Sequence, residues 1–295
     1  MLYARNILWQ RSRWFALLIW LMIHAIAGIS PAASGERGLL WKMESANTPT
    51  SYLFGTIHTD DERVREFSPK LKQAMQQCQS FMMEIAPASD MSAAFLPHGT
   101  LRDLLQPEEI DKVLRLVDQL AMHDEVALRM KPWLLAAVLS LPRPQSPWYQ
   151  DVLLYYLAND LNLQLLGIET PAEHYSALDS LSQEEQLTLL RTVLDQTQEE
   201  KEKAFEMVLQ AYLDKDVERI LEADEQWSGA TLPDALWDKV KSVLLDQRNA
   251  RMAQRIEEQA RKGAVFVAVG ASHLPGEDGL IARLRRAGFV LSPIQ

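Results

Sequence analysis

The chain has 295 residues, of which 47% are hydrophobic and 24% are charged, an ordinary balance for a globular protein with a sizeable core. Beyond residue 33 it carries 27 basic and 40 acidic residues, a net charge of −13. Because phosphate backbones bind basic surfaces, this acidity argues against a nucleic-acid partner. The single cysteine, Cys78, excludes an internal disulfide and is expected to be a buried apolar side chain rather than a nucleophile.

The first 33 residues differ from the rest of the chain. Arg5, Arg11 and Arg13 precede an uncharged stretch over residues 14–29, and small residues follow it. The stretch is shorter than the roughly 20 apolar residues that a spanning helix needs. These features predict a signal peptide over residues 1–33, and therefore a periplasmic or secreted protein. The alternative is an uncleaved N-terminal anchor, which would be the protein's only contact with a membrane.

The residues that follow predict the start of an α/β fold. Weak alternation on both sides of a turn predicts a hairpin over residues 39–57. Ser68 and Pro69 then mark the N-terminus of a helix that runs to about residue 79, and residues 81–85 form an apolar strand. A strand, helix and strand in such a short stretch predict parallel pairing with a right-handed crossover.

The middle of the chain is predicted to be mostly helical, with a short strand over residues 163–169. The charged stretch 182–213, which includes Lys201, predicts one long exposed helix with a solvated face. Another long helix is expected over residues 234–261. The apolar, β-branched run 264–269 predicts a strand buried on both faces, as in a parallel sheet. A terminal strand follows at residues 289–291.

These elements predict one α/β domain over residues 34–295, with a mostly parallel central sheet, flanking helices and a large helical insertion over about residues 91–228. No repeat or long linker divides it. One domain with an insertion explains the pattern more simply than two domains do.

Four predicted strands end in polar residues that suit one site: His58, Glu84, Glu169 and His273. Both histidines stand in a Gly-x-x-His pattern, which begins at Gly55 in the first case and at Gly270 in the second. Ligands of open α/β sheets bind outside the carboxyl ends of parallel strands, so we expect these four side chains to converge. A glutamate in the apolar strand 81–85 would be costly to bury without a partner.

Two imidazoles and a carboxylate are a common ligand set for Zn, Mn, Co or Fe. Such a metal lowers the pKa of its bound water, and a second carboxylate can act as a general base. The alternative that these histidines are ordinary loop residues stays open. A single Gly-x-x-His is a low-specificity pattern, and a histidine after a strand is commonly a loop residue. Three acidic residues follow His58, namely Asp60, Asp61 and Glu62. They either add oxygen ligands to the metal or form a solvated loop. Arg248 either directs a guanidinium into the site or lies on a helix surface.

Motifs that the chain lacks narrow the chemistry further. It contains no Gly-x-Ser-x-Gly elbow, no His-Glu-x-x-His, no phosphate-binding loop and no dinucleotide-binding Gly-x-Gly-x-x-Gly. Serine hydrolases, zincins, nucleoside triphosphatases and dehydrogenases are therefore disfavoured.

Several short stretches, in this order along the chain, resemble the TraB/GumN/TIKI family, which is related to the erythromycin-esterase-like and ChaN-like proteins. They are Leu40-Trp41-Lys42, the stretch 52–58, Met83-Glu84-Ile85, Lys131-Pro132-Trp133, the stretch 166–170, Arg248-Asn249 and the stretch 269–276. The family's two Gly-x-x-His motifs and glutamate fall here on His58, His273 and Glu84. Ser272 occupies a place where glycine is frequent, a change that should be tolerated.

The resemblance implies a metal-dependent hydrolase, because the animal TIKI proteins are similar to peptidases that favour Mn or Co. We therefore expect an exported hydrolase acting on a peptide or small-molecule amide with a divalent metal, Mn, Co or Zn. His58 and His273 would bind the metal, Glu84 would be ligand or base, and Glu169 and Arg248 would support the substrate or transition state. The alternative is a non-catalytic protein that sequesters a peptide or small ligand, or carries haem or metal, on the same fold.

Overall fold

The computed structural model describes residues 37–86 and 92–294, apart from the side chains of residues 227–230. The predicted signal peptide or anchor lies outside this part of the chain. Among the residues described, no helix combines the length and the apolar character needed to cross a membrane.

A six-stranded sheet organises the fold, in the order β4-β3-β5-β2-β1-β6. Its strands are β1 (Leu40–Glu44), β2 (Ser51–Thr56), β3 (Ser80–Ile85), β4 (Gln164–Glu169), β5 (Val265–Gly270) and β6 (Val290–Pro293). The four strands β4, β3, β5 and β2 are parallel to one another. β1 is antiparallel to both β2 and β6. The predicted α/β class with a mostly parallel sheet is therefore confirmed.

β5 lies between β2 and β3 and is buried along almost its whole length, as its apolar sequence predicts. The register pairs Gly55 with Val269 and Thr56 with Gly270. The two Gly-x-x-His turns therefore leave adjacent parallel strands at nearly the same level. On the other side of β5, Ile85 of β3 pairs with Glu169 of β4.

Helices account for most of the remaining chain. Before β4 they are α2 (Glu62–Arg65), α3 (Pro69–Gln76), α4 (Pro107–Gln119), α5 (Asp124–Arg129), α6 (Pro132–Ser140) and α7 (Gln150–Asp160). After β4 they are α8 (Pro171–Asp179), α9 (Gln183–Asp195), α10 (Gln198–Leu213), α11 (Val217–Thr231), α12 (Asp234–Lys241), α13 (Gln247–Ala260) and α14 (Leu280–Arg286). Three short 3₁₀ turns, η1 (Ser92–Ala94), η2 (Leu101–Asp103) and η4 (Ala271–His273), and a π-helical segment, η3 (Ser242–Asp246), complete the elements.

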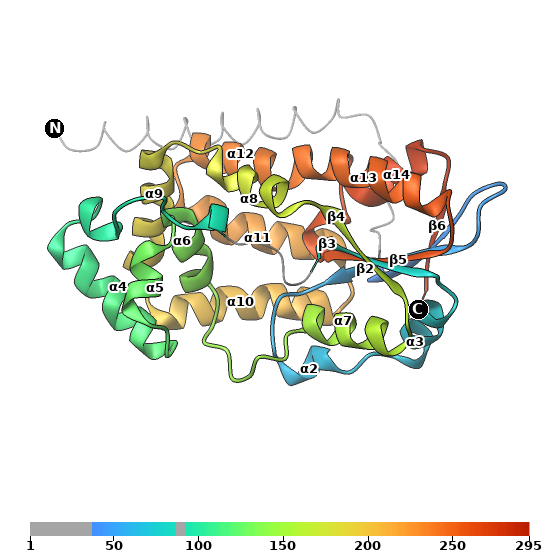
Figure 1. Ribbon diagram of the computed structural model, residues 1–295, viewed down its shortest axis with the longest axis horizontal. Helices are drawn as coiled ribbons and strands as arrows, with labels where there is room; N and C mark the ends of the chain where they lie inside the picture. Colours follow the sequence, from blue (N-terminus) through green and yellow to red (C-terminus); the bar gives the residue numbers. More distant parts are fainter. Residues whose placement is uncertain (1–36, 87–91, 295) are drawn as a thin grey trace, which may run out of the picture. The chain divides into compact units, whose positions relative to one another are not determined.

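The crossovers place helices on both faces of the sheet. α13 and α14 lie along one face, and α7 and α3 lie on the other (Figure 1). The crossover from β2 to β3 contains α3 and the one from β3 to β4 contains α7, whereas the connection after β5 contains α14. β5 is thus flanked by the points at which the connections change direction, where open α/β sheets bind their ligands.

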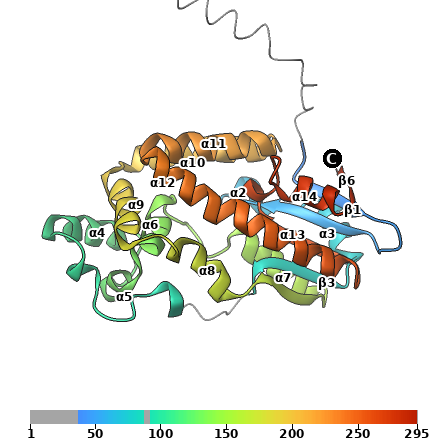
Figure 2. The same ribbon diagram turned by 90° about the horizontal axis from the view of Figure 1, so that it is seen from above.

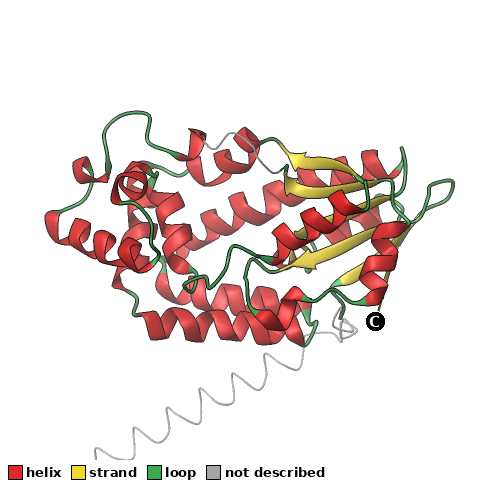
Figure 3. Ribbon diagram, turned by 60° about the horizontal axis from the view of Figure 1, so that its bottom comes forward, coloured by secondary structure: helices red, strands yellow, loops and turns green. Residues whose placement is uncertain are grey.

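The helices α4, α5, α6 and α9 lie away from the edge strands β1 and β6, as Figures 1 and 2 both show. They have a core of their own, which includes Val113, Leu135 and Leu190. Figure 3 shows this part as helix and loop without strands. The main core is built on the sheet and contains Phe81, Phe266 and Trp41.

Two predicted long helices have interruptions in the structure. The helix expected over residues 182–213 is two helices, because Thr197 accepts a hydrogen bond from the Glu200 N–H and begins α10 with a capping box. The helix expected over residues 234–261 keeps its course but contains the π-helical segment Ser242–Asp246. Such segments occur often at functional sites, and this one directly precedes Arg248.

Candidate functional site

The carboxyl edge of the parallel strands carries the predicted residues in the order of the strands. Glu169 ends β4, Glu84 lies near the end of β3, His273 follows β5 and His58 follows β2. Neighbouring strands are about 4.8 Å apart, so β2 is separated from β3 by roughly 10 Å of sheet. His273 therefore lies between Glu84 and His58 along this edge, and His58 is at one end of the row of four residues.

Arg248 joins three of the four. Its Nη2 donates to Glu84 Oε2 at 2.5 Å and to Glu169 Oε2 at 2.7 Å, and its Nε also donates to Glu169. Its Nη1 is 3.4 Å from Nε2 of His273. The Arg248 side chain is only 6% exposed. It therefore points into the site from α13 and does not lie on the helix surface.

The two carboxylates are ionised, although Glu169 is fully buried and Glu84 is partly buried. Burial would raise the pKa of Glu169, but hydrogen bonds from His174 and Arg248 outweigh it and hold the pKa at about 2. Arg251 is a further donor to the same carboxylate. Burial acts in the same direction on Glu84. There, His273, Arg248 and the N–H of Gly270, which donates at 2.9 Å, hold the pKa well below its usual range.

His273 is buried, and its surroundings favour one tautomer. Its Nδ1 lies 2.7 Å from Oδ1 of Asn249, an atom that can only accept, so the proton is assigned to Nδ1. Nε2 is then free of a proton and lies 3.8 Å from Oε1 of Glu84. Burial, only partly offset by Glu84, lowers the pKa of His273 to about 4. The ring is therefore neutral at pH 7, the form that binds metals.

His174 belongs to the same cluster, a role that the sequence analysis missed. Its Nδ1 lies 3.3 Å from Glu169 Oε2, 3.9 Å from Glu84 Oε2 and 3.1 Å from Nη2 of Arg248. Glu84, Glu169 and His174 form a group whose ligand atoms lie within 4.8 Å of one another. Spacing along the sequence could have indicated this role. Thr170 caps α8 immediately after β4, and the first turn of this helix brings His174 back to the strand end.

His58 has different neighbours. Its Nδ1 lies 3.4 Å from Oδ2 of Asp151, and its ring stacks on Tyr149 with the centroids 4.5 Å apart. The hydrogen bond that His58 donates to Asp151 raises the pKa of His58. Its side chain is 63% exposed, and within the described part of the chain no hydrogen bond or ion pair joins it to Glu84 or His273.

The acidic residues after His58 have structural partners. Asp60 accepts hydrogen bonds from the backbone N–H groups of Gln145 and Ser146. Asp61 caps α2 by accepting from the N–H of Arg63. Cys78 is buried, which raises the pKa of its thiol to about 12, so it is an inert side chain as expected.

The donor set fits a divalent metal ion. The unprotonated Nε2 of His273 and the ionised carboxylate of Glu84 are of the types that Zn, Mn and Co accept. Their 3.8 Å separation is within the span of two atoms that each lie about 2 Å from one ion. Arg248 can release Glu84 to an ion and still keep Glu169, which it contacts through two nitrogens.

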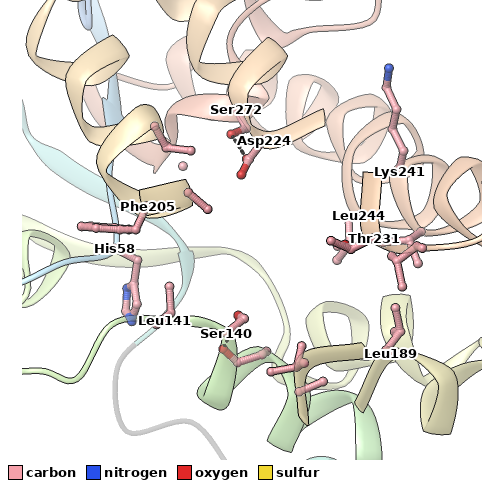
Figure 4. Close-up of a pocket in the computed structure, with 18 of the residues that line it drawn as sticks. His58, Ser140, Leu141, Leu189, Phe205, Asp224, Thr231, Lys241, Leu244 and Ser272 are labelled. Carbon is pink, nitrogen blue, oxygen red and sulfur yellow. Dashed lines mark hydrogen bonds between the residues drawn. The ribbon is translucent and has the colours of Figure 1, made fainter. Parts of the chain in front are cut away.

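A cavity of about 470 Å³ opens beside the turns that follow β2 and β5. Its wall includes Thr56, Ile57 and His58 at one turn and the stretch 270–272 at the other, together with side chains of α6, α9, α10, α11 and α12. In Figure 4, His58 and Leu141 face one end of this space, while Leu189 and Leu244 face the other. Glu84 and His273 are not part of the wall, so the cavity adjoins the Arg248 cluster without enclosing it.

Comparison with known proteins identifies the family of the chain. A model of the TraB/PrgY/gumN family matches residues 39–293. A curated relative named Metalloprotease TIKI1, from Danio rerio, is 26% identical over 321 aligned positions, which cover 87% of this chain and 63% of the relative. The chain thus spans less than two thirds of the length of that relative. Because the family match covers nearly all of the described residues, the chain belongs to the TraB/PrgY/gumN family.

Proposed function

We propose that this protein is a divalent-metal-dependent hydrolase of peptides or small amides, with its centre at Glu84 and His273. One observation carries the proposal: Asn249 holds the Nδ1 proton of His273, and this directs the unprotonated Nε2 toward the carboxylate of Glu84. The relative named a metalloprotease supports the reaction class. Export to the periplasm or outside the cell is part of the proposal, and rests on the basic and apolar character of residues 1–33.

A divalent ion bound by Glu84 and His273 would lower the pKa of water and polarise a carbonyl group. Asn249 fixes the tautomer and orientation of the His273 ring. Glu169, held by Arg248 and Arg251, positions the Arg248 guanidinium, whose charge can stabilise an oxyanion that develops beside it. The sequence predicts His58 as the third ligand, whereas the structure places His174 nearer to Glu84.

The test is hydrolysis of a peptide library by protein that has been stripped with chelator and resupplied with Mn, Co or Zn. We expect products only after metal is added, and at least a hundredfold loss of rate in Glu84→Gln. Of His58→Ala and His174→Ala, the variant that weakens metal binding identifies the third ligand. His98→Ala, which changes an exposed histidine, is the control. No turnover with any of the three metals would contradict the proposal.

One observation favours a second candidate, a non-catalytic protein that sequesters a peptide or small ligand. Arg248 and Arg251 already balance the charges of Glu84 and Glu169, so the two carboxylates have counter-charges without a metal. This candidate predicts ligand binding that is unchanged by chelator, with no product formed over time.

A further inference from the structure

Lys201 is the one charged side chain in the cavity wall without a partner among the described residues. It is 3% exposed, and no hydrogen bond or ion pair joins it to another described side chain. The sequence pattern assigned it to a solvated helix face, and this assignment is wrong. The other ionisable groups of the wall are paired: His58 with Asp151, Asp224 with Ser272, and Lys241 with Glu225.

An unpaired ammonium group is costly to bury, because nothing replaces the water that it loses. Burial accordingly lowers the pKa of Lys201, and no carboxylate offsets the effect. Lys201 also lies in the first turn of α10, where the helix dipole repels a cation. A position that is unfavourable in two ways, burial without a partner and the helix dipole, makes physical sense when an anion completes it.

Two other side chains of the same wall have unpaired polar atoms. Oε1 of Gln196 and Nε1 of Trp133 are buried without a hydrogen-bond partner among the described residues. Gln196 precedes the N-cap Thr197 and Lys201 is the fourth residue of α10, positions whose side chains lie next to each other at a helix N-terminus. The wall therefore offers an unmatched cation and an unmatched acceptor next to each other, and an unmatched N–H donor on α6.

The rest of the wall is predominantly apolar and runs along α10. Ala204, Phe205 and Val208 separate Lys201 from Tyr212, whose hydroxyl donates to the backbone oxygen of Gly55 at the end of β2. Eleven residues of helix place Lys201 about 16 Å from Tyr212 along the axis. The cavity thus extends from the carboxyl edge of the sheet to an isolated positive charge.

We propose that this cavity binds an extended apolar chain ending in a carboxylate, with the carboxylate at Lys201. A single cation suits a monoanion, whereas a phosphate dianion would leave charge unmatched. A chain of about 12 carbons and an apolar peptide of four residues, at about 3.3 Å per residue, both fit this length. A fatty acid and the C-terminus of an apolar peptide therefore share the required chemistry. The inference rests on the cavity and does not depend on hydrolysis.

Calorimetric titration tests the site without metal or turnover. It uses the full chain carrying Glu84→Gln, in a buffer that contains a chelator. The probes are dodecanoate against dodecanol, and an N-acetylated apolar tetrapeptide acid against its C-terminal amide. We expect at least one of the acids to bind with about one molecule per chain and at least tenfold more tightly than its neutral counterpart. The pair with the larger difference distinguishes a lipid-derived ligand from a peptide.

Lys201→Met should weaken binding of the acid about 10- to 100-fold and leave the neutral probe unchanged. Lys203→Met, which removes an exposed lysine from the same helix, should have no effect. Lys201→Met should also raise the melting temperature of the free protein, because it removes an unpaired buried charge. Equal binding of acid and neutral probes, binding of neither, an unchanged preference in Lys201→Met, or a lowered melting temperature would each overturn the proposal.

Discussion

The two Gly-x-x-His turns end adjacent parallel strands, yet their histidines have opposite surroundings. His273 is buried, hydrogen-bonded to Asn249 and lowered in pKa to about 4. His58 is 63% exposed, and Asp151 raises its pKa. The same local motif therefore fixes where the backbone turns, while side chains from distant parts of the chain determine what each imidazole can do. The turn after β5 holds a buried, neutral imidazole beside Glu84, and the turn after β2 holds an exposed imidazole beside Asp151 at the cavity rim.

The largest expected effect comes from removing Arg248, the cation beside the buried His273. Arg248→Met leaves Glu84 and Glu169 without their shared partner, so the free energy of unfolding should fall by about 3–5 kcal/mol. Denaturant titration measures this. Arg261→Met is the control, because its exposed pair with Glu257 should contribute less than about 1 kcal/mol. A similar small loss for both variants would show that the cluster is not tightly coupled.

The opposite pKa shifts of the two histidines predict opposite pH effects in metal-free protein. His273 has a folded pKa of about 4 against 6.5 for the free side chain, so the unfolded chain binds the extra proton between these values. Its contribution to stability is lost as the pH falls from 6.5 to 4, on the order of 2–3 kcal/mol. His58, whose folded pKa is raised, contributes stability below pH 6.5 that is lost as the pH rises.

Denaturation between pH 4 and pH 8 in wild type, His273→Gln and His58→Gln separates the two effects. His273→Gln should flatten the acid side of the stability curve. His58→Gln should change only a small slope on the alkaline side, because His58 is mostly exposed. If stability still falls to the same extent between pH 6.5 and pH 4 in His273→Gln, the lowered pKa of His273 is not its cause.

A smaller effect is expected from the residue that orients His273. Asn249→Leu removes the acceptor for Nδ1–H, so the ring loses its fixed tautomer and metal affinity should fall about 10- to 100-fold. Competition with a fluorescent chelator measures the affinity. Asn159→Leu, which changes an exposed helical asparagine outside the site, is the control, and an affinity equal to that of wild type in Asn249→Leu would break the proposed link.

The smallest effect belongs to the exposed turn. Asp151→Asn should lower the pKa of His58 toward its ordinary value, because the neighbouring charge is lost. Titration of the histidine ring protons by NMR reports this directly. Stability should change by less than about 1 kcal/mol, as for other exposed pairs. An unchanged pKa of His58 would show that Asp151 does not act on it.

Local patterns predicted most of the fold. The buried run before Gly270 and the strand, helix and strand after Gly55 specified a parallel sheet, because apolar runs of this length bury both faces only in that setting. The break between α9 and α10 was missed, although the sequence Thr197-x-x-Glu200 is a capping box. The charge pattern concealed Lys201, since composition does not show which residue of a charged helix faces inward.

The candidate site was only partly predictable for a related reason. Strand ends could be recognised one at a time, so Glu84, Glu169 and His273 were named from the sequence. Which of them touch depends on strand order, and the position of β5 between β2 and β3 cannot be deduced from local pattern. Asp151 reaches His58 from α7, far along the chain, and no local signal distinguishes it from other polar residues, whereas the position of His174 could have been inferred from its spacing after Glu169.

Metal content measured by mass spectrometry tests the central claim most directly, namely that Glu84 and His273 hold a divalent ion. The protein would be stripped, reconstituted with Mn, Co or Zn, desalted and compared with a Glu84→Gln/His273→Gln double variant and with His98→Ala. The proposal predicts about one ion per chain in wild type and in His98→Ala, and none in the double variant. No retained metal in wild type, or equal metal in the double variant, would contradict it.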